Sequence, residues 1–342
     1  MGMLYKVDNI EGKNLGCIAL KTIKRGTLIV QEKLVCCHFG EIKSSWIPIW
    51  NSYNNMSQSD RLEYDKLYNR YKEIKNLKEA KKWRDSLLET NFSEEIADLT
   101  VEVFGIYFSN SFTQGVGIQT SRFNHSCAAN TEFQFNESLG KMEVRAVSKI
   151  KPGEEITINY IPHKISMKNF KTRQEYLLNG WKFNCMCNLC IEEGDSSDEK
   201  YEEFAKLQEE AEILSGDETN SWIYQLEKIK KEVSCYKEMY KLAKEKNVSR
   251  EFIINYILNP AIDAATQGYL SSFGSVTGRV QNQEFKSDCN RFSKAGEQIS
   301  TDVLGREHPI SIEWKKKRCD FDAWIKYSGV AIRSIWSDPN QF

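Results

Sequence analysis

The chain has 342 residues, of which 40% are hydrophobic, enough to bury one large core or two ordinary ones, and this excludes an intrinsically disordered protein. There are 47 Lys and Arg residues and 48 Asp and Glu residues, which gives a net charge of −1. This charge provides no general attraction to nucleic acid or to an anionic membrane. Residues 1–10 lack a basic region followed by an apolar run. We therefore expect no secretory signal and a soluble protein of the cytoplasm, the nucleus or both.

The first half of the chain begins with predicted strands and continues with predicted helices. Short apolar runs separated by turns predict strands at residues 17–20, 28–30 and 34–37. From about residue 47 the apolar residues recur at helical spacing. We expect one helix to follow a cap at Ser59-Asp60 and to reach Tyr71, and a second to begin near Ser93. Ile96, Leu99 and Val103 are expected to share one face of this second helix.

From residue 107 to residue 160 the pattern returns to that of short strands. They are predicted at residues 132–135, 142–147 and 155–160. A charged helix is expected at residues 168–178, followed by an acidic linker at residues 191–199. The remainder is predicted to be largely helical, because apolar residues keep a spacing of three or four: Tyr201, Phe204, Leu207, Ala211 and Leu214, then Trp222, Leu226, Ile229, Val233 and Tyr236.

Three segments carry residues of functional interest, and each has a plainer interpretation when it is taken alone. Residues 12–19, followed by residues 24–29, are typical of an ordinary glycine turn in a hairpin. Residues 121–130 read Ser-Arg-Phe-Asn-His-Ser-Cys-Ala-Ala-Asn, in which a lone His125 is more often a core residue. Residues 152–160 form a turn and a strand that end at Tyr160, which by itself indicates structure more than chemistry.

Nine of the ten cysteines form one cluster of three and a scattered set of six, and the tenth, Cys127, lies in the segment 121–130. Cys185, Cys187 and Cys190 make a C-x-C-x-x-C pattern, which supplies three of the four ligands that a structural zinc site requires. Buried or oxidised cysteines are the alternative, as is a zinc site whose fourth ligand lies elsewhere, with His163 the nearest candidate. The scattered cysteines are expected to be reduced and buried: Cys17, Cys36, Cys37, Cys235, Cys289 and Cys319.

Taken together and in this order, the three segments and the cysteine cluster resemble a SET domain, closest to that of the SET-and-MYND type of protein lysine methyltransferase. The resemblance covers residues 10–40 and 101–192, and the MYND module is absent because residues 39–116 contain no cysteine. It implies an α+β fold with a core of small curved sheets. The implied parts are a SET core at 1–40 and 101–165, a helical insertion at 41–100, a zinc-bound post-SET segment at 166–192 and an α-helical C-terminal domain at 193–342.

The same resemblance implies a protein that transfers methyl groups from S-adenosylmethionine to a lysine of a histone or non-histone protein. Tyr160 would be the catalytic residue. The cofactor-binding residues would be Lys13, which would hold the cofactor carboxylate, Phe183, which would stack on adenine, and Leu15, Asn124, His125 and Tyr160. Phe112 and Trp181 would form walls of the substrate lysine channel. A structural Zn²⁺ would be held by Cys127, Cys185, Cys187 and Cys190.

Some positions depart from the family pattern and favour a second hypothesis. Asn14 and Leu15 stand where the first motif has glycine and arginine, and Trp181 stands where the subfamily commonly has a channel tyrosine. These departures suggest a catalytically silent SET-like module that binds a peptide partner. A zinc-dependent nucleic-acid binder is a more distant alternative, because basic residues are interleaved with acidic ones. The sequence predicts neither the substrate protein nor the oligomeric state.

Overall fold

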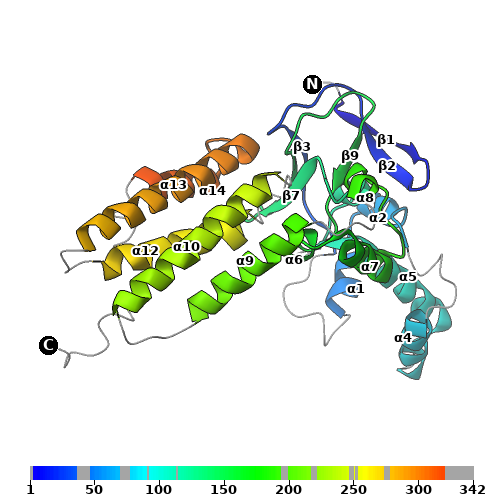
Figure 1. The fold of residues 1–342 in the computed structure, drawn as a ribbon. Coiled ribbons are helices and arrows are strands. Elements are labelled where there is room, and N and C mark those ends of the chain that lie inside the picture. The colour runs from blue at the N-terminus through cyan, green and yellow to red at the C-terminus, as the bar shows by residue number, and fades with distance from the viewer. Residues whose placement is uncertain are drawn as a thin grey trace. The chain divides into compact units, whose positions relative to one another are not determined.

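A computed structural model of the chain describes residues 3–36, 47–69, 78–90, 92–112, 115–193, 199–216, 222–245, 250, 253–272 and 278–319. The chain divides into two compact units, Met1–Ile158 and Asn159–Phe342. We call the first the β-rich unit and the second the helical unit, and each is shown in Figure 1. Among the described residues, no helix is both long enough and apolar enough to cross a membrane.

The strands of the β-rich unit form three small sheets. Their bounds are β1 Tyr5–Ile10, β2 Asn14–Ala19, β3 Leu28–Glu32, β4 Ser111–Phe112, β5 Gly115–Val116, β6 Asn124–His125, β7 Thr131–Asn136, β8 Lys141–Ala146 and β9 Glu155–Ile158. The sheet orders are β1-β2-β9-β6, β3-β8-β7 and β4-β5. The predicted strands at 17–20, 28–30, 132–135 and 142–147 are confirmed within a few residues. Val35 makes only an isolated bridge to Val116, and Cys37 lies outside the described residues.

Several helices between residues 47 and 110 of the β-rich unit begin or end at other residues than predicted. These helices are α1 Ile47–Asn54, α2 Gln58–Tyr64, α4 Lys78–Glu89 and α5 Glu94–Asn110. Ser57, not Ser59 or Asp60, caps α2 by accepting a hydrogen bond from the Asp60 amide. The helix ends at Tyr64 and does not reach Tyr71, which lies outside the described residues.

Helix α5 begins as predicted but buries a different face. Ser93 caps it and accepts from the amide of Ile96. Ile96 and Leu99 are exposed, however, whereas the buried stripe contains Val103. The rest of that stripe is Ala97, Thr100, Phe104, Ile106 and Tyr107. The helix also continues to Asn110, past the expected change to strands at residue 107.

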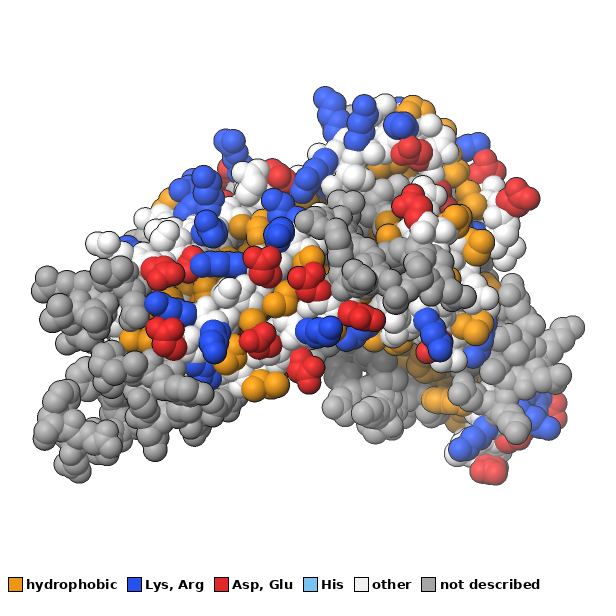
Figure 2. Space-filling model, viewed as in Figure 1, with side chains coloured by type: hydrophobic (Ala, Val, Ile, Leu, Met, Phe, Trp, Pro, Cys, Tyr) orange, Lys and Arg blue, Asp and Glu red, His pale blue; other side chains and the backbone are white. Residues whose placement is uncertain are grey.

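The helical unit has a hydrophobic core of its own, built mainly by its longer helices. Its elements are α6 His163–Ser166, α7 Phe170–Trp181, α8 Asn188–Glu193, α9 Glu199–Gly216, α10 Trp222–Glu245, the π-helix Ile253–Leu258, α12 Asn259–Ser271, α13 Gly278–Leu304 and α14 Pro309–Cys319. The predicted spacing on α9 and α10 is confirmed, because Phe204, Ala211, Leu226 and Val233 all lie in this core. Figure 2 shows acidic and basic side chains interleaved on the drawn face of this unit.

Candidate functional site

The sheet β1-β2-β9-β6 brings the three sequence motifs together. Strand β2 carries the glycine-rich motif, β6 is the Asn124-His125 pair, and β9 ends two residues before Tyr160. β9 pairs antiparallel with β2, with Ile18 opposite Glu155, and parallel with β6, with Asn124 opposite Thr157. Residues 109 positions apart in the chain therefore come within hydrogen-bond distance.

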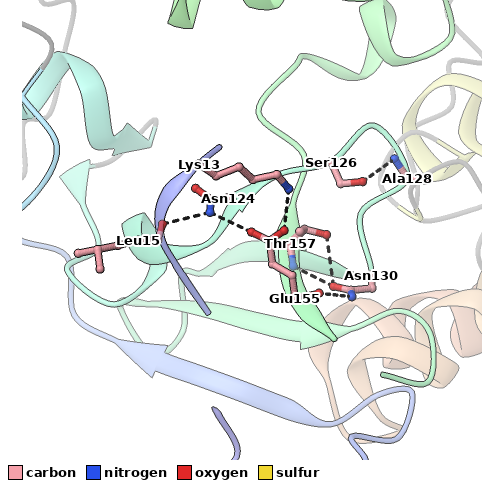
Figure 3. A network of polar contacts seen from close by, with 8 residues as sticks. All are labelled: Lys13, Leu15, Asn124, Ser126, Ala128, Asn130, Glu155 and Thr157. Carbon is pink, nitrogen blue, oxygen red and sulfur yellow. Dashed lines mark hydrogen bonds and ion pairs between the residues drawn. The ribbon is translucent and has the colours of Figure 1, made fainter. Parts of the chain in front are cut away.

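Asn130 fixes β9 beside the Asn-His segment. Its Nδ2 donates to the carbonyl oxygen of Glu155 at 2.8 Å, and its Oδ1 accepts from the amide of Thr157 at 2.9 Å (Figure 3). The hydroxyl of Thr131 donates to the Thr157 carbonyl oxygen at 2.7 Å. These bonds satisfy backbone groups on β9 that would otherwise be buried without partners. As a result, the strand holds the side chain of Glu155 in one place.

The carboxylate of Glu155 is the centre of a network that joins three segments. Its Oε2 accepts from the Lys13 ammonium at 2.6 Å, and its Oε1 accepts from Nδ2 of Asn124 at 2.9 Å (Figure 3). Nδ2 of Asn124 also donates to the carbonyl oxygen of Leu15 at 3.1 Å. The Glu155 side chain is 17% exposed and that of Lys13 is 33% exposed. Three of the predicted cofactor-binding residues, Lys13, Leu15 and Asn124, are thus brought together by a fourth residue.

Gly16 is required by the close approach of β2 to this network. A Cβ added at Gly16 would lie 2.5 Å from Nδ2 of Asn124 and 2.6 Å from Cγ1 of Ile10, and such contacts do not occur without displacement. Asn14, two residues earlier, has a φ of 59°, in the left-handed region. Asparagine adopts this region more readily than other residues with a side chain, so it can replace glycine here.

His125 lies in the core, and one of its ring nitrogens is close to a predicted zinc ligand. The residue is 4% exposed, and its Nε2 lies 3.4 Å from Sγ of Cys127. Hydrogen bonds to sulfur are long, and this distance is within their range. The predicted contact of His125 with the cofactor remains a prediction, while its contact with Cys127 is a feature that the sequence did not indicate.

The predicted catalytic and channel residues lie in aromatic clusters of their own units. In the helical unit, the ring of Tyr160 lies 5.7 Å from that of Trp181, which in turn lies 6.0 Å from that of Tyr176. In the β-rich unit, Phe112 packs edge-to-face on Phe133 at 4.8 Å. Tyr160 is not the last residue of β9, since the strand ends at Ile158. Phe183, in the segment after α7, is half-buried, and its role remains a prediction.

The four predicted zinc ligands are brought together. The sulfur atoms of Cys127, Cys185, Cys187 and Cys190 all lie within 4.8 Å of one another. In a tetrahedral site with Zn–S bonds of about 2.3 Å, the sulfur atoms would lie about 3.8 Å apart, so the donor set fits a structural zinc. The side chain of His163, the alternative ligand, lies outside what the structure describes.

The cysteine loop is also held by a residue that the sequence did not single out. Gln174 on α7 donates from Nε2 to the carbonyl oxygen of Cys185 at 2.8 Å and accepts from the amide of the same cysteine at 2.7 Å. Lys182, with a left-handed φ of 63°, ends α7 and turns the chain toward Cys185. The loop is therefore positioned by hydrogen bonds to α7.

Most of the scattered cysteines are core residues, as predicted. Cys17, Cys36, Cys235 and Cys289 are buried, and no described cysteine is in a disulfide. Burial raises the pKa of Cys17 and that of Cys289 to about 12, so these thiols stay protonated and unreactive. Cys319 is exposed, which corrects the expectation for that residue.

Comparison with known proteins gives a consistent result. A family model described as SET domain matches residues 14–161. A putative SET domain-containing protein, L678 of Acanthamoeba polyphaga mimivirus, is 30% identical over 216 residues, which are 58% of this chain and 81% of that protein. Histone-lysine N-methyltransferase set5 of Schizosaccharomyces pombe is 27% identical over 192 residues, 55% of this chain and 50% of that one.

Other matches are shorter or more distant. Protein-lysine N-trimethyltransferase SMYD5 of Mus musculus is 35% identical over 96 residues, which are 28% of this chain and 23% of that protein. A solved structure, the SET domain of LSMT bound to lysine and AdoHcy, aligns over 94% of this chain and 89% of that one, with 15% identity and a TM-score of 0.38. The viral protein is 30% identical and is matched over 81% of its length, and the family model matches residues 14–161. The chain therefore belongs to the SET-domain family.

Proposed function

We propose that this protein is an S-adenosylmethionine-dependent protein-lysine N-methyltransferase. The observation that carries the proposal is the network in which Lys13 and Asn124 converge on Glu155, on the sheet that leads to Tyr160. Two matched relatives are named as protein-lysine methyltransferases, although this chain spans only 50% and 23% of their lengths. The five-part organisation expected from the sequence, with a SET core at 1–40 and 101–165, belongs to the same proposal.

The donors and acceptors of the network fit the amino-acid end of the cofactor. The Lys13 ammonium has three hydrogens and gives one to Glu155, which leaves two for a carboxylate. Both amide hydrogens of Asn124 are used, by Leu15 and Glu155, so its Oδ1 is left as an acceptor for an ammonium group. The missing Cβ of Gly16 lets β2 approach this cradle closely. Leu15, whose side chain is exposed, would lie along the bound cofactor.

The cofactor supplies a methyl group on a positively charged sulfonium. The chain must bring a neutral lysine amine in line with that methyl, although a free lysine has a pKa of about 10.4 and is protonated at neutral pH. A narrow apolar channel walled by Phe112 and Trp181 would lower that pKa by desolvation. Methyl transfer would form the bond between the lysine nitrogen and the methyl carbon as the sulfur–carbon bond broke, and the proton that the lysine loses would pass to water. In-line positioning supplies much of the acceleration.

Tyr160 would orient the amine or the methyl group through its hydroxyl. Its neighbour Trp181 replaces the tyrosine that the subfamily commonly has, and Phe183 would stack on adenine. The zinc would be structural: bound to Cys127 and to the three cysteines of the loop, it would hold the segment that carries Phe183. Loss of the zinc would then reduce activity, although the zinc would take no direct part in the chemistry.

The experiment that tests the proposal is a methyl-transfer assay with Tyr160→Phe. Losing the hydroxyl should reduce the rate about 100-fold, while the affinity for S-adenosylmethionine stays within about twofold. Tyr176→Phe is the matched control, because Tyr176 belongs to the same aromatic cluster and should tolerate the change. Equal activity in the Tyr160 variant would refute its assigned role. A folded wild-type protein that does not bind S-adenosylmethionine would favour the silent binding module.

A further inference from the structure

We propose that Glu155 is a positioning residue that holds Lys13 and Asn124 in the orientation needed to bind the amino-acid end of S-adenosylmethionine. The inference rests on the proposed function. It assigns a role to Glu155, which was not among the site residues predicted from the sequence. Glu155 meets Lys13 at 2.6 Å and Asn124 at 2.9 Å, with one carboxylate oxygen for each (Figure 3).

The division of the two oxygens makes the carboxylate hard to replace. A glutamine at this position has one oxygen and one NH₂ group, so with the two donors where they stand only one of them would meet an acceptor. Its NH₂ group would face a second donor, and that donor would lose its partner. Without the bond at Oε1, the amide of Asn124 would keep only its bond to the Leu15 carbonyl oxygen, and its own oxygen would be held less firmly toward the cofactor. Asn130 and the pairing of β9 keep the backbone of Glu155 in place in either case.

A purely electrostatic role predicts a different result. Glu155 neutralises the charge of Lys13, so its removal would leave a positive charge that attracts the carboxylate of the cofactor more strongly. The Lys13 side chain is 33% exposed and that of Glu155 is 17% exposed, so salt would screen this electrostatic attraction. The loss of orientation, in contrast, persists at high salt. The two roles therefore predict opposite signs and different salt dependence.

The test compares Glu155→Gln with Glu154→Gln in calorimetric titrations of the zinc-loaded full chain. Glu154, the preceding residue, is the matched control: its change to Gln removes the same charge, it is exposed, and its carboxylate accepts from the backbone amide of Lys151. The probes are S-adenosylhomocysteine, which carries the amino-acid end, and 5′-methylthioadenosine, which lacks it. We expect Glu155→Gln to raise the Kd of S-adenosylhomocysteine about tenfold at both 0.05 M and about 0.5 M salt. Its Kd for 5′-methylthioadenosine should stay within about twofold, as should both constants for Glu154→Gln.

Several results would overturn the inference. These are an unchanged or lower Kd for S-adenosylhomocysteine, an effect on this Kd that vanishes at high salt, or an equal loss of affinity for both ligands.

Should Glu155→Gln fail to fold, Glu155→Asp keeps the charge but shortens the side chain, and it should still weaken the binding of S-adenosylhomocysteine selectively. In steady state, the KM for the cofactor should rise while kcat at saturating cofactor is kept. Failure of the wild-type protein to bind S-adenosylhomocysteine at all would refute the proposed function instead.

Discussion

Asn14 shows how a departure from the family pattern can be neutral at the scale of one residue. Its φ of 59° is a conformation that glycine usually fills, and asparagine is among the residues that tolerate it best. Its presence in place of glycine is therefore compatible with an unchanged turn. This weakens one of the observations that favoured a silent module, whereas Leu15 and Trp181 still differ chemically from the residues they replace.

Gly16, in contrast, has no acceptable replacement. Gly16→Ala would place a methyl group 2.5 Å from Nδ2 of Asn124, so the strand or the amide must move. We expect a loss of about 1–3 kcal/mol in the free energy of unfolding and weaker binding of S-adenosylmethionine. Gly180→Ala is the control: nothing lies within 4 Å of the added Cβ on α7, and alanine favours the helix. Thermal unfolding and calorimetry check both variants, and an unperturbed Gly16→Ala would contradict the tight packing.

His125 should influence zinc through its contact with Cys127. A buried imidazole 3.4 Å from Sγ can donate to the thiolate and stabilise it as a ligand. We expect His125→Gln to lower the zinc affinity about 10- to 100-fold, measured by competition with a chromogenic chelator. Equal zinc affinities of the variant and the wild-type protein would show that the contact has no effect on the metal.

At the scale of elements, the sequence predicted most strands and helices, and the buried faces of α9 and α10, but not the buried face of α5. Helix α5 begins at its predicted cap, yet Ile96 and Leu99 face solvent while Val103 is buried, because helix packing selected the neighbouring stripe through Ala97 and Thr100. Apolar residues at several spacings allow more than one stripe, and only tertiary contacts decide between them.

The same limit applies to the candidate site. The motifs predicted Lys13, Asn124 and the four cysteines as site residues, because each belongs to a recognisable local pattern. Glu155 lies within the motif at residues 152–160 but was not singled out there, and Gln174 belongs to no such pattern. Their roles depend on strand register and on the approach of a helix to a loop, respectively. The only sequence signal for Glu155 was its position in the predicted strand that leads to Tyr160.

The zinc segment is an element whose stability should depend on its metal. Cys187→Ser should release the zinc and increase hydrogen exchange over residues 165–192, since four thiolates are needed to complete the tetrahedron. Cys319→Ser removes an exposed cysteine outside the cluster and should retain one zinc per chain. Elemental analysis of both purified variants measures this directly, and a full zinc content in the Cys187 variant would rule out that ligand.

At the scale of the whole molecule, stability should depend on pH through a buried carboxyl group. Burial raises the pKa of Glu232 from an ordinary 4.5 to about 7, although Lys228 and Tyr236 act in the opposite direction. The folded chain therefore keeps a proton that the unfolded chain releases, so the contribution of Glu232 to stability is complete below pH 4.5 and falls as pH rises from 4.5 to about 7. We expect Glu232→Gln to raise the melting temperature at pH 8 but to change it little at pH 4.5.

The exposed Glu227, on the same helix, supplies the control for that experiment. Glu227→Gln should shift the melting temperature by a similar small amount at both pH values. A parallel pH response of the two variants would show that burial of Glu232 does not set the dependence.

The whole account depends on a cofactor cradle built from β2, β6 and β9 and joined by Glu155. Its most direct test is a calorimetric titration of the zinc-loaded chain with S-adenosylmethionine. The account predicts saturable binding of one molecule per chain, which Asn124→Ala abolishes or strongly weakens. A folded wild-type protein that shows no saturable binding would contradict it.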